Sequence, residues 1–369
     1  MRKQISALTG LRFFFVVLLF LHHWDMFADL QIPGYTQLMK YLSEGYVSVD
    51  FFFVLSGFVI TYSYLPRLQS KEVTPSTFLF NRVSKLYPVH LFLWVLCTVA
   101  YGGFSHILQN VLAKQFWIGA LLLQSYVPIN GFAFWGNEVS WTVSTELFFY
   151  IAFIFLIKFT AKEKTWIFSL LLGVILFNSI AIGNESPIAS WLYYINPIFR
   201  LLDFIAGMLL CEFMQKMSYH PSSVKTATLL EVSSLMVLIC FMVISSNSPI
   251  RYNPRFQSYY YLIPSLYIIF AFSFSKGYVS KLFSTKFFLV LGNCSFTFFM
   301  VHRFVLFLIK KYFASYITTI SELCKFGLLG LVVSIIAALL LHYGYEKPIN
   351  QFLRKKWKNR KQGERLYNG

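Results

Sequence analysis

The chain has 369 residues, of which 57% are hydrophobic, 20% aromatic and 13% charged, against about 25% charged residues in an average soluble domain. This composition excludes a soluble fold, because apolar runs of about 18 residues, long enough to cross a bilayer, recur from end to end. The formal charge of +17 would suggest nucleic-acid binding in a soluble protein, but here the basic residues stand between apolar segments, where they indicate topology and contact with membrane lipids. We therefore expect an all-α protein, a polytopic bundle of transmembrane helices with no nucleic-acid partner.

The first apolar stretch follows a Met-Arg-Lys start and resembles a signal peptide. It contains Arg12, His22 and His23 and lacks a small-residue cleavage site, so we expect a retained first helix. Apolar windows along the rest of the chain bring the expected number of spans to about ten. The predicted spans cover 8–27, 46–65, 87–104, 139–158, 166–182, 198–214, 229–246, 259–275, 287–309 and 323–345.

A further apolar stretch at 111–127 leaves the count at ten or eleven. Short cytoplasmic loops are enriched in Lys and Arg, and a non-spanning 111–127 places most loop bases and the basic tail on one side. We therefore predict ten spans with both termini in the cytoplasm. The region 111–137, with Pro128, Gly131 and several aromatic residues, is then predicted to be a re-entrant or interfacial segment.

The sequence predicts one transmembrane domain over 1–350 and a basic cytoplasmic tail over 351–369, without a second domain or an internal repeat. The tail is expected to contact anionic lipid. The five cysteines are scattered in apolar stretches without a CxxC or Cys/His cluster. Neither a disulfide framework nor a metal site is therefore expected.

Ionisable side chains occur inside several predicted spans. Each costs a few kcal/mol on insertion scales, so each is a candidate functional residue until a pairing explains it. They are Arg12, His22, His23, Asp50, Glu146, Arg200, Asp203, His302 and Arg303.

Depth along the spans separates the candidate residues into two groups. At 1.5 Å per residue, Arg12 lies near the inner boundary and His23 lies about 16 Å further out. The same counting places Asp50, Glu146 and His302 in the outer half with His23. The basic residues expected at the inner boundary are Arg12, Arg82, Lys85 and those of the tail.

The outer residues and the basic inner residues are suited to different parts of one group-transfer reaction. An imidazole hydrogen-bonded to a carboxylate can take a proton from a hydroxyl. A cationic inner rim suits the phosphates of a nucleotide-containing donor. Together they predict transfer of a group from a phosphorylated cytoplasmic donor to an alcohol near the outer face. A proton-coupled transporter or flippase of an envelope precursor stays open as the alternative, because buried His, Asp and Glu also form proton relays.

Seven short motifs follow one another along the chain. They are Arg12 and His23 separated by ten residues, GYVSVDFFFVLSGF at 45–58, NRVSKLYP at 81–88, WTVSTELFFY at 141–150, RLLDFIAG at 200–207, LGNCSFTFFMVH at 291–302 and YEKP at 345–348. In this order they resemble the motifs of acyltransferase family 3, membrane proteins that move acyl groups, usually acetyl from acetyl-CoA, onto sugars and other envelope acceptors. The resemblance covers nearly the whole chain.

Two positions depart from the family pattern. Arg82 and Lys85 stand where the family's basic loop motif usually has two arginines, so the charge is kept but bidentate gripping of phosphate at the second position is lost. Trp141-Thr142 stands where the family has Trp-Ser, which keeps a hydroxyl. Neither departure argues against acyl transfer.

The resemblance implies three catalytic residues. His23 is expected to be the general base, or the imidazole that handles the acyl group. Asp50 is expected either to orient His23 or to be a structural partner of Arg200 or Arg303. Glu146 is expected to take part in acid–base chemistry or in acceptor binding.

Other residues are implied to bind the two substrates. Phosphates of the donor, acetyl-CoA, are expected at Arg12, Arg82 and Lys85, with snorkelling to headgroups as the alternative for Arg12. Trp141, Ser144, Tyr150, His302 and Arg303 are expected to contact the acceptor. For the last two residues, oxyanion stabilisation and satisfied core pairing stay open.

Two further motifs are expected to be structural. Ser56-Gly57 is expected to permit close helix packing rather than to supply a nucleophile. Glu346-Lys347-Pro348 is expected to end the last helix at the inner boundary.

These expectations describe an O-acetyltransferase of the bacterial inner membrane. It would take acetyl from cytoplasmic acetyl-CoA and acylate a hydroxyl of a cell-envelope glycan, such as a polysaccharide or lipopolysaccharide, or of a lipid-linked sugar. The acceptor, the donor chain length and the formation of a homo-oligomer stay open.

Overall fold

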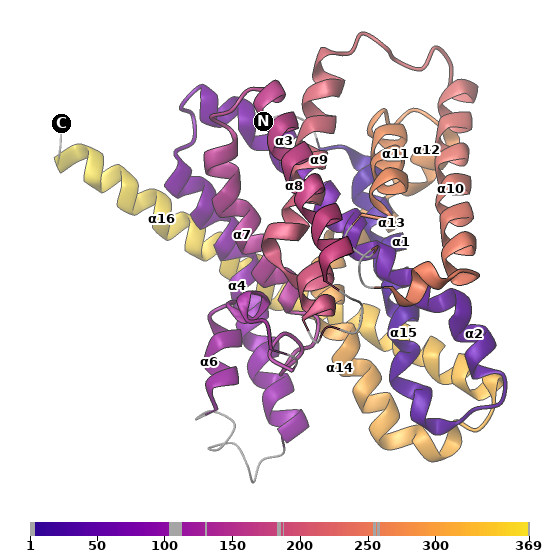
Figure 1. Ribbon diagram of the computed structural model, residues 1–369. Coiled ribbons are helices and arrows are strands. Elements are labelled where there is room, and N and C mark those ends of the chain that lie inside the picture. Colours follow the sequence, from indigo (N-terminus) through magenta and orange to yellow (C-terminus); the bar gives the residue numbers. More distant parts are fainter. Residues whose placement is uncertain are drawn as a thin grey trace.

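The structure is a computed structural model that describes residues 4–102, 113–129, 131–182, 186, 188–253, 256 and 259–367. All regular structure in these ranges is helical, as predicted (Figure 1). The first half contains α1 (Ser6–His22), η1 (His23–Leu30), α2 (Tyr35–Leu42), η2 (Ser43–Tyr46), α3 (Val47–Gln69), α4 (Pro75–Gly102), α6 (Lys114–Ala120), η4 (Gln124–Tyr126), α7 (Trp141–Leu156) and α8 (Ala161–Ala181). The second half contains η5 (Trp191–Ile195), α9 (Pro197–Lys216), α10 (Val224–Ser246), η6 (Pro249–Tyr252), α11 (Leu262–Ser273), α12 (Tyr278–Phe283), α13 (Lys286–Asn293), α14 (Ser295–Phe313), η8 (Ala314–Tyr316), α15 (Ile320–Leu341), η9 (His342–Glu346) and α16 (Lys347–Tyr367).

Six helical segments of the described chain are long and apolar enough to cross a membrane. They are Ser6–Leu30, Tyr35–Gln69, Pro75–Gly102, Ala161–Ala181, Val224–Ser246 and Ile320–Gln362. The segments Lys286–Asn293 and Ser295–Tyr316, bent by 66° at their junction, would make a seventh. The protein therefore has the helices of a membrane protein, but the predicted count of ten spans is not confirmed.

The length and the charge of individual helices explain why fewer than ten helical segments qualify as membrane spans. The apolar helices α7 and α11 have 16 and 12 residues, which at 1.5 Å per residue gives about 24 and 18 Å against a hydrocarbon core of about 30 Å. Helix α9 is long enough but carries Arg200, Asp203 and Glu212. Apolar windows in the sequence do not distinguish a complete span from a short helix packed inside the bundle.

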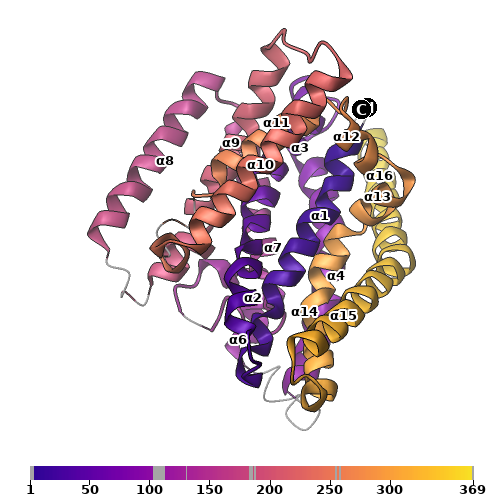
Figure 2. The ribbon, with the colours of Figure 1, turned by 90° about the vertical axis from the view of Figure 1, so that its right-hand side faces the viewer.

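The peripheral helices expose apolar side chains. Figure 2 shows α8 and α15 on opposite flanks of the bundle. Ile180 on α8, Leu229 on α10 and Leu340 on α15 are 83%, 70% and 69% exposed. Polar residues such as Asp50 and Arg200 are instead fully buried. This distribution is typical of a protein whose outer surface faces lipid.

Helices α3 and α9 cross at the centre of the bundle through two glycines. A Cβ atom at Gly57 would lie 2.0 Å from the carbonyl oxygen of Phe204, and one at Gly207 would lie 2.0 Å from that of Val54. Only glycine allows the two backbones to approach this closely. The packing role expected for Ser56-Gly57 is confirmed for the glycine.

The segment predicted to be re-entrant or interfacial consists of short helices and turns where it is described. Its longest helix, α6, has seven residues. Gln124, Ser125 and Asn137 are buried, and the Asn137 amide donates to the Met300 carbonyl at 2.9 Å. These residues pack into the bundle, whereas the side chains of Trp117, Leu121 and Ile129 in the same segment are more than half exposed. Residues 103–104, 111–112 and 130 of the predicted segments lie outside the described residues.

The basic motif at 81–88 lies inside α4 rather than in a loop. The Thr74 side chain accepts a hydrogen bond from the Thr77 backbone N–H at 3.3 Å, and Pro75 is the first helical residue, where its missing N–H costs little. The helix therefore begins before the motif. Arg82 and Lys85, three residues apart, then lie on one helical face.

The last helix does not end at Glu346-Lys347-Pro348, contrary to expectation. The π turn η9 joins α15 to α16, and Pro348 falls in the first turn of α16, where a missing N–H is tolerated. The predicted domain boundary at residue 350 therefore lies within α16. The Trp357 ring stacks on Phe80 of α4 at 4.3 Å, so the basic tail, where it is described, is a helix docked on the bundle.

Candidate active site

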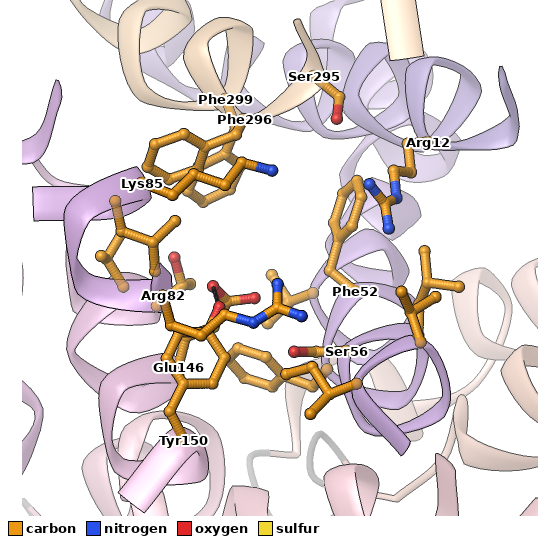
Figure 3. A pocket seen from close by; sticks show the side chains of 18 of the residues that line it. Arg12, Phe52, Ser56, Arg82, Lys85, Glu146, Tyr150, Ser295, Phe296 and Phe299 are labelled. Carbon is orange, nitrogen blue, oxygen red and sulfur yellow. Dashed lines mark hydrogen bonds between the residues drawn. The ribbon is translucent and has the colours of Figure 1, made fainter. Parts of the chain in front are cut away.

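A cavity whose charged lining residues are mostly basic, here called the basic cavity, lies between α1, α3, α4, α7 and α14. Its accessible volume is about 140 Å³. Arg12, Arg82, Lys85 and Glu146 line it, and Figure 3 shows these side chains pointing towards one central space. The structure therefore brings together the three residues predicted to bind the donor, from two helices far apart in the sequence.

Aromatic rings support Arg82 in the basic cavity. Its guanidinium lies 4.7 Å from the Tyr64 ring centroid and 5.7 Å from that of Tyr150. Among the described residues, no acidic side chain lies within 4.0 Å of Arg82. Stacking restricts the side chain without neutralising its charge, so Arg82 is held ready for an anion.

Glu146 lies in the basic cavity and not beside His23, contrary to the depth prediction. It accepts a hydrogen bond from the Tyr150 hydroxyl at 2.8 Å, which places Tyr150 in the same cavity. The reason is the start of α7. Trp141 to Thr145 are all buried, so this helix begins inside the bundle, and a count of residues from an outer membrane surface places Glu146 too far out.

A second cavity, here called the histidine cavity, has an accessible volume of about 390 Å³ and lies at the far end of α1. Its polar lining comes from the end of α1, from η1, from the turn before α7 and the start of α7, from η5 and from α14. The polar lining residues are His22, His23, Asp25, Glu138, Trp141, Thr142, Tyr194 and Arg303.

Arg303 organises the polar groups of the histidine cavity. Its Nη1 atom donates to Asp25 Oδ1 at 2.7 Å and to the His23 carbonyl at 3.3 Å, and its Nε atom donates to Glu138 Oε2 at 2.5 Å. Nη1 also lies 3.4 Å from His23 Nδ1, and Asp25 Oδ1 lies 4.0 Å from the same nitrogen. Arg303 therefore ties η1 to the turn before α7 and fixes the position of His23.

His302 is buried beside His23, with ring centroids 5.1 Å apart. Its Nδ1 lies 2.7 Å from the Phe299 carbonyl oxygen, so Nδ1 carries the proton that this bond needs. In the neutral ring Nε2 is then an acceptor, and it has no hydrogen-bond partner among the described residues. An acceptor cannot stabilise an oxyanion, so the geometry argues against that role for His302, while its pairing in the core is limited to the Nδ1 hydrogen bond.

Asp50 belongs to a separate buried ion cluster. Its carboxylate lies 2.9 Å from Arg200 Nη2, and Asp203 lies 3.4 Å from Arg200 Nε. All three side chains are fully buried. Of the alternatives for Asp50, the geometry selects the structural partner of Arg200.

Trp141 and Ser144, which are also predicted to bind the acceptor, lie in different surroundings. Trp141 lines the histidine cavity, whereas Ser144 donates to the Leu122 carbonyl at 2.6 Å and contacts the Ser125 hydroxyl at 2.6 Å. Ser144 therefore anchors the turns before α7.

Asp25 and Glu138 are the carboxylates of the histidine cavity, and sequence reasoning missed both. The signal in the sequence that could have identified them is their position beside predicted site residues. Asp25 follows His23 by two residues, and Glu138 precedes Trp141 by three. Both fall at the ends of apolar windows, where a charged residue is ordinarily solvated, so neither stood out.

Ligand atoms of His22, His23 and Asp25 lie within 4.8 Å of one another, a spacing compatible with a metal ion. The same Asp25 carboxylate is paired with Arg303. The guanidinium already supplies the positive charge that a metal would bring, so this donor set fits a metal poorly.

A family model described as an acyltransferase domain matches residues 5–341 of the chain. The chain belongs to acyltransferase family 3. This family membership makes the protein an acyltransferase enzyme and gives the transporter alternative no support.

Two relatives place the chain within the family. It is 27% identical to acyltransferase MdmB of Streptomyces mycarofaciens, over 95% of this chain and 92% of that protein. It is 23% identical to O-acetyltransferase OatA of Staphylococcus aureus (strain NCTC 8325 / PS 47), over 84% of this chain, and it covers 52%, about half, of that relative's length. No solved structure matches the chain.

Proposed function

We propose that this acyltransferase is an O-acetyltransferase of the bacterial inner membrane that moves acetyl from cytoplasmic acetyl-CoA to a hydroxyl of a cell-envelope glycan or lipid-linked sugar. The observation that carries the proposal is a cavity lined by three basic side chains that shares wall residues with a histidine-containing cavity. Acyl transfer from CoA needs both features, a site for phosphates and a base beside the acceptor hydroxyl.

The arrangement of basic residues supports an orientation with the basic cavity towards the cytoplasm. Arg12 lies near the start of α1, and Arg82 lies near the start of α4, where Arg354 of α16 donates to the Asn81 carbonyl at 2.9 Å. The start of α1 and the end of α16 lie at the same end of the molecule (Figure 1, Figure 2). Lys and Arg concentrate on the cytoplasmic side of membrane proteins.

The charge of the basic cavity suits a CoA thioester. Arg12, Arg82 and Lys85 supply three positive charges against the one carboxylate of Glu146. The phosphates of acetyl-CoA would bind these side chains, with Arg82 held by its aromatic neighbours. Glu146 is then a donor-side residue, which positions Tyr150 and the basic side chains.

The acceptor hydroxyl would bind beside His23. As the hydroxyl oxygen attacks the thioester carbonyl carbon, the neutral imidazole of His23 takes its proton and Arg303 faces the oxyanion that forms. Collapse of the intermediate breaks the C–S bond, and the proton on His23 passes to the CoA thiolate. Asp25 and Glu138 hold Arg303 and His23 in place.

The test is the O-acetyl content of envelope glycans in cells that lack the gene. Proton NMR before and after mild base is expected to lose the acetyl resonance on deletion and regain it with the wild-type gene. His23→Ala, expressed at the same level, is expected not to restore it. His220→Ala is the matched control, because His220 is exposed in the connection between α9 and α10.

An unchanged acetyl resonance after deletion would overturn the glycan acceptor. Full restoration by His23→Ala would overturn the role of His23. Binding of acetyl-CoA to the purified protein, weakened in Arg82→Ala, tests the donor separately, and absence of binding would overturn acetyl-CoA as the donor.

A further inference from the structure

The basic cavity and the histidine cavity meet at a junction formed by three residues, Val49 of α3, Thr142 of α7 and Phe299 of α14. These three line both cavities. Phe299 is the largest of them and the only ring. Figure 3 shows both Phe299 and Phe296 at one edge of the basic cavity.

The junction is held by packing and hydrogen bonds. Val49 and Thr142 are 5% and 8% exposed, and the Thr142 hydroxyl donates to the Val139 carbonyl at 2.9 Å. The carbonyl of Phe299 accepts the hydrogen bond from His302 Nδ1, and the His302 ring lies beside His23. The wall between the cavities is therefore tied to the elements that carry the candidate base.

The reaction constrains where the acyl group lies. In the proposed function, on which this inference rests, the thioester arrives from the basic cavity and the hydroxyl waits beside His23. The new C–O bond forms as the C–S bond breaks, and the hydroxyl proton leaves through His23 to the CoA sulfur. The carbonyl carbon must therefore lie at the junction, and the rest of the acyl chain must fit beyond it.

We propose that Phe299, with Val49 and Thr142, restricts this enzyme to short acyl donors. A chain longer than acetyl meets the Phe299 ring at the junction. Past the ring it enters a cavity that holds the charged groups of Asp25, Glu138 and Arg303 beside apolar side chains such as Leu19 and Val139, and that the acceptor must occupy in the proposed function. Acetyl avoids both the contact with the ring and the competition with the acceptor for this space.

The experiment compares acyl-CoA donors in inverted membrane vesicles that contain the native acceptor. Vesicles receive radiolabelled acetyl-CoA, butyryl-CoA or hexanoyl-CoA, and base-labile label in the glycan fraction is counted. Wild-type protein is expected to prefer acetyl over butyryl by about tenfold or more, and Phe299→Ala is expected to raise the butyryl-to-acetyl ratio by about tenfold, the scale on which pockets discriminate methylene groups.

Phe296→Ala is the matched control. Phe296 lies on the same helix and lines the basic cavity but not the histidine cavity. Whatever this change does to the overall rate, it is expected to leave the butyryl-to-acetyl ratio unchanged. A ratio that Phe299→Ala does not move, or that Phe296→Ala moves equally, overturns the role of Phe299.

Two further variants cover a Phe299→Ala protein that does not fold. Thr142→Ser removes one methyl group from the junction and keeps the hydroxyl that bonds to Val139, and it is expected to raise the same ratio by a smaller factor. Val49→Phe narrows the junction and is expected to slow acetyl transfer without weakening acetyl-CoA binding. Failure of both expectations overturns the proposal. Wild-type vesicles that incorporate no label from any donor would instead overturn the proposed function, and the junction with it.

Discussion

The basic cavity and the histidine cavity differ in how their charges are arranged. In the basic cavity, Arg12, Arg82 and Lys85 form no ion pair within 4.0 Å in the described part of the chain. In the histidine cavity, Arg303 is paired with both Asp25 and Glu138. Positive charge left unpaired is available to an anionic ligand, whereas paired charge positions its own side chains.

The two sets of ionisable residues are similar in composition but differ in pairing. The unpaired set is proposed to bind an anionic donor, and the paired set holds the His23 imidazole. The buried cluster of Asp50, Arg200 and Asp203 belongs to neither cavity and joins α3 to α9 through the Asp50–Arg200 ion pair. Each of the following changes tests one side of this division.

His23→Ala has the largest expected effect. Loss of a general base lowers the rate by about 10²- to 10⁴-fold, measured as acetyl incorporation in vesicles at saturating acetyl-CoA. His22→Ala is the neighbouring control. Its imidazole Nδ1 is engaged with the Ser43 carbonyl at 2.6 Å, so we expect a much smaller loss. Equal losses in both variants would remove the distinction between the two histidines.

Arg200→Leu is expected to destabilise the protein rather than to alter substrate binding. It leaves two buried carboxylates without their partner, at a cost of about 3–5 kcal/mol, read as a lower midpoint of thermal unfolding in detergent. Arg67→Leu breaks the half-exposed pair with Glu72 and is expected to shift the midpoint little. A stable Arg200→Leu protein that lacks activity would assign this cluster to catalysis.

Arg82→Ala is expected to raise the KM for acetyl-CoA by about 10- to 100-fold, since a charged hydrogen bond contributes about 1.5–3 kcal/mol. The rate at saturation is expected to fall far less. Arg82→Lys keeps the charge and is expected to recover part of the affinity. If KM stays constant while the rate falls, Arg82 acts in the chemical step and the division between the cavities is wrong.

The charge of the acceptor has the smallest expected effect. Two carboxylates and one guanidinium line the histidine cavity, so we expect a neutral methyl glycoside to compete for acetyl a few-fold better than the corresponding uronate. Glu138→Gln is expected to reduce this difference. An acidic sugar that competes better than the neutral one would contradict the charge assigned to the cavity.

Sequence reasoning identified the two chemical groups but not all their members. Arg12, Arg82 and Lys85 were predicted to act together, and they line one cavity. Glu146 was assigned to the wrong group, because the depth of a residue was counted from an assumed helix start at the membrane surface. The sequence allows two roles for Asp50: it orients His23, or it pairs with an arginine. Only the packing of α3 against α9 shows that Asp50 pairs with Arg200.

The sequence by itself determined the membrane class, the helical fold and the family, because apolar runs and motif order are local properties of the chain. Tertiary structure alone decided which helices are too short to span, that Asp25 and Glu138 meet at Arg303, and that Phe299 stands between the two cavities. The physical reason is that these contacts depend on where helices start and how closely they cross. Those quantities are set by the packing of side chains from distant parts of the chain.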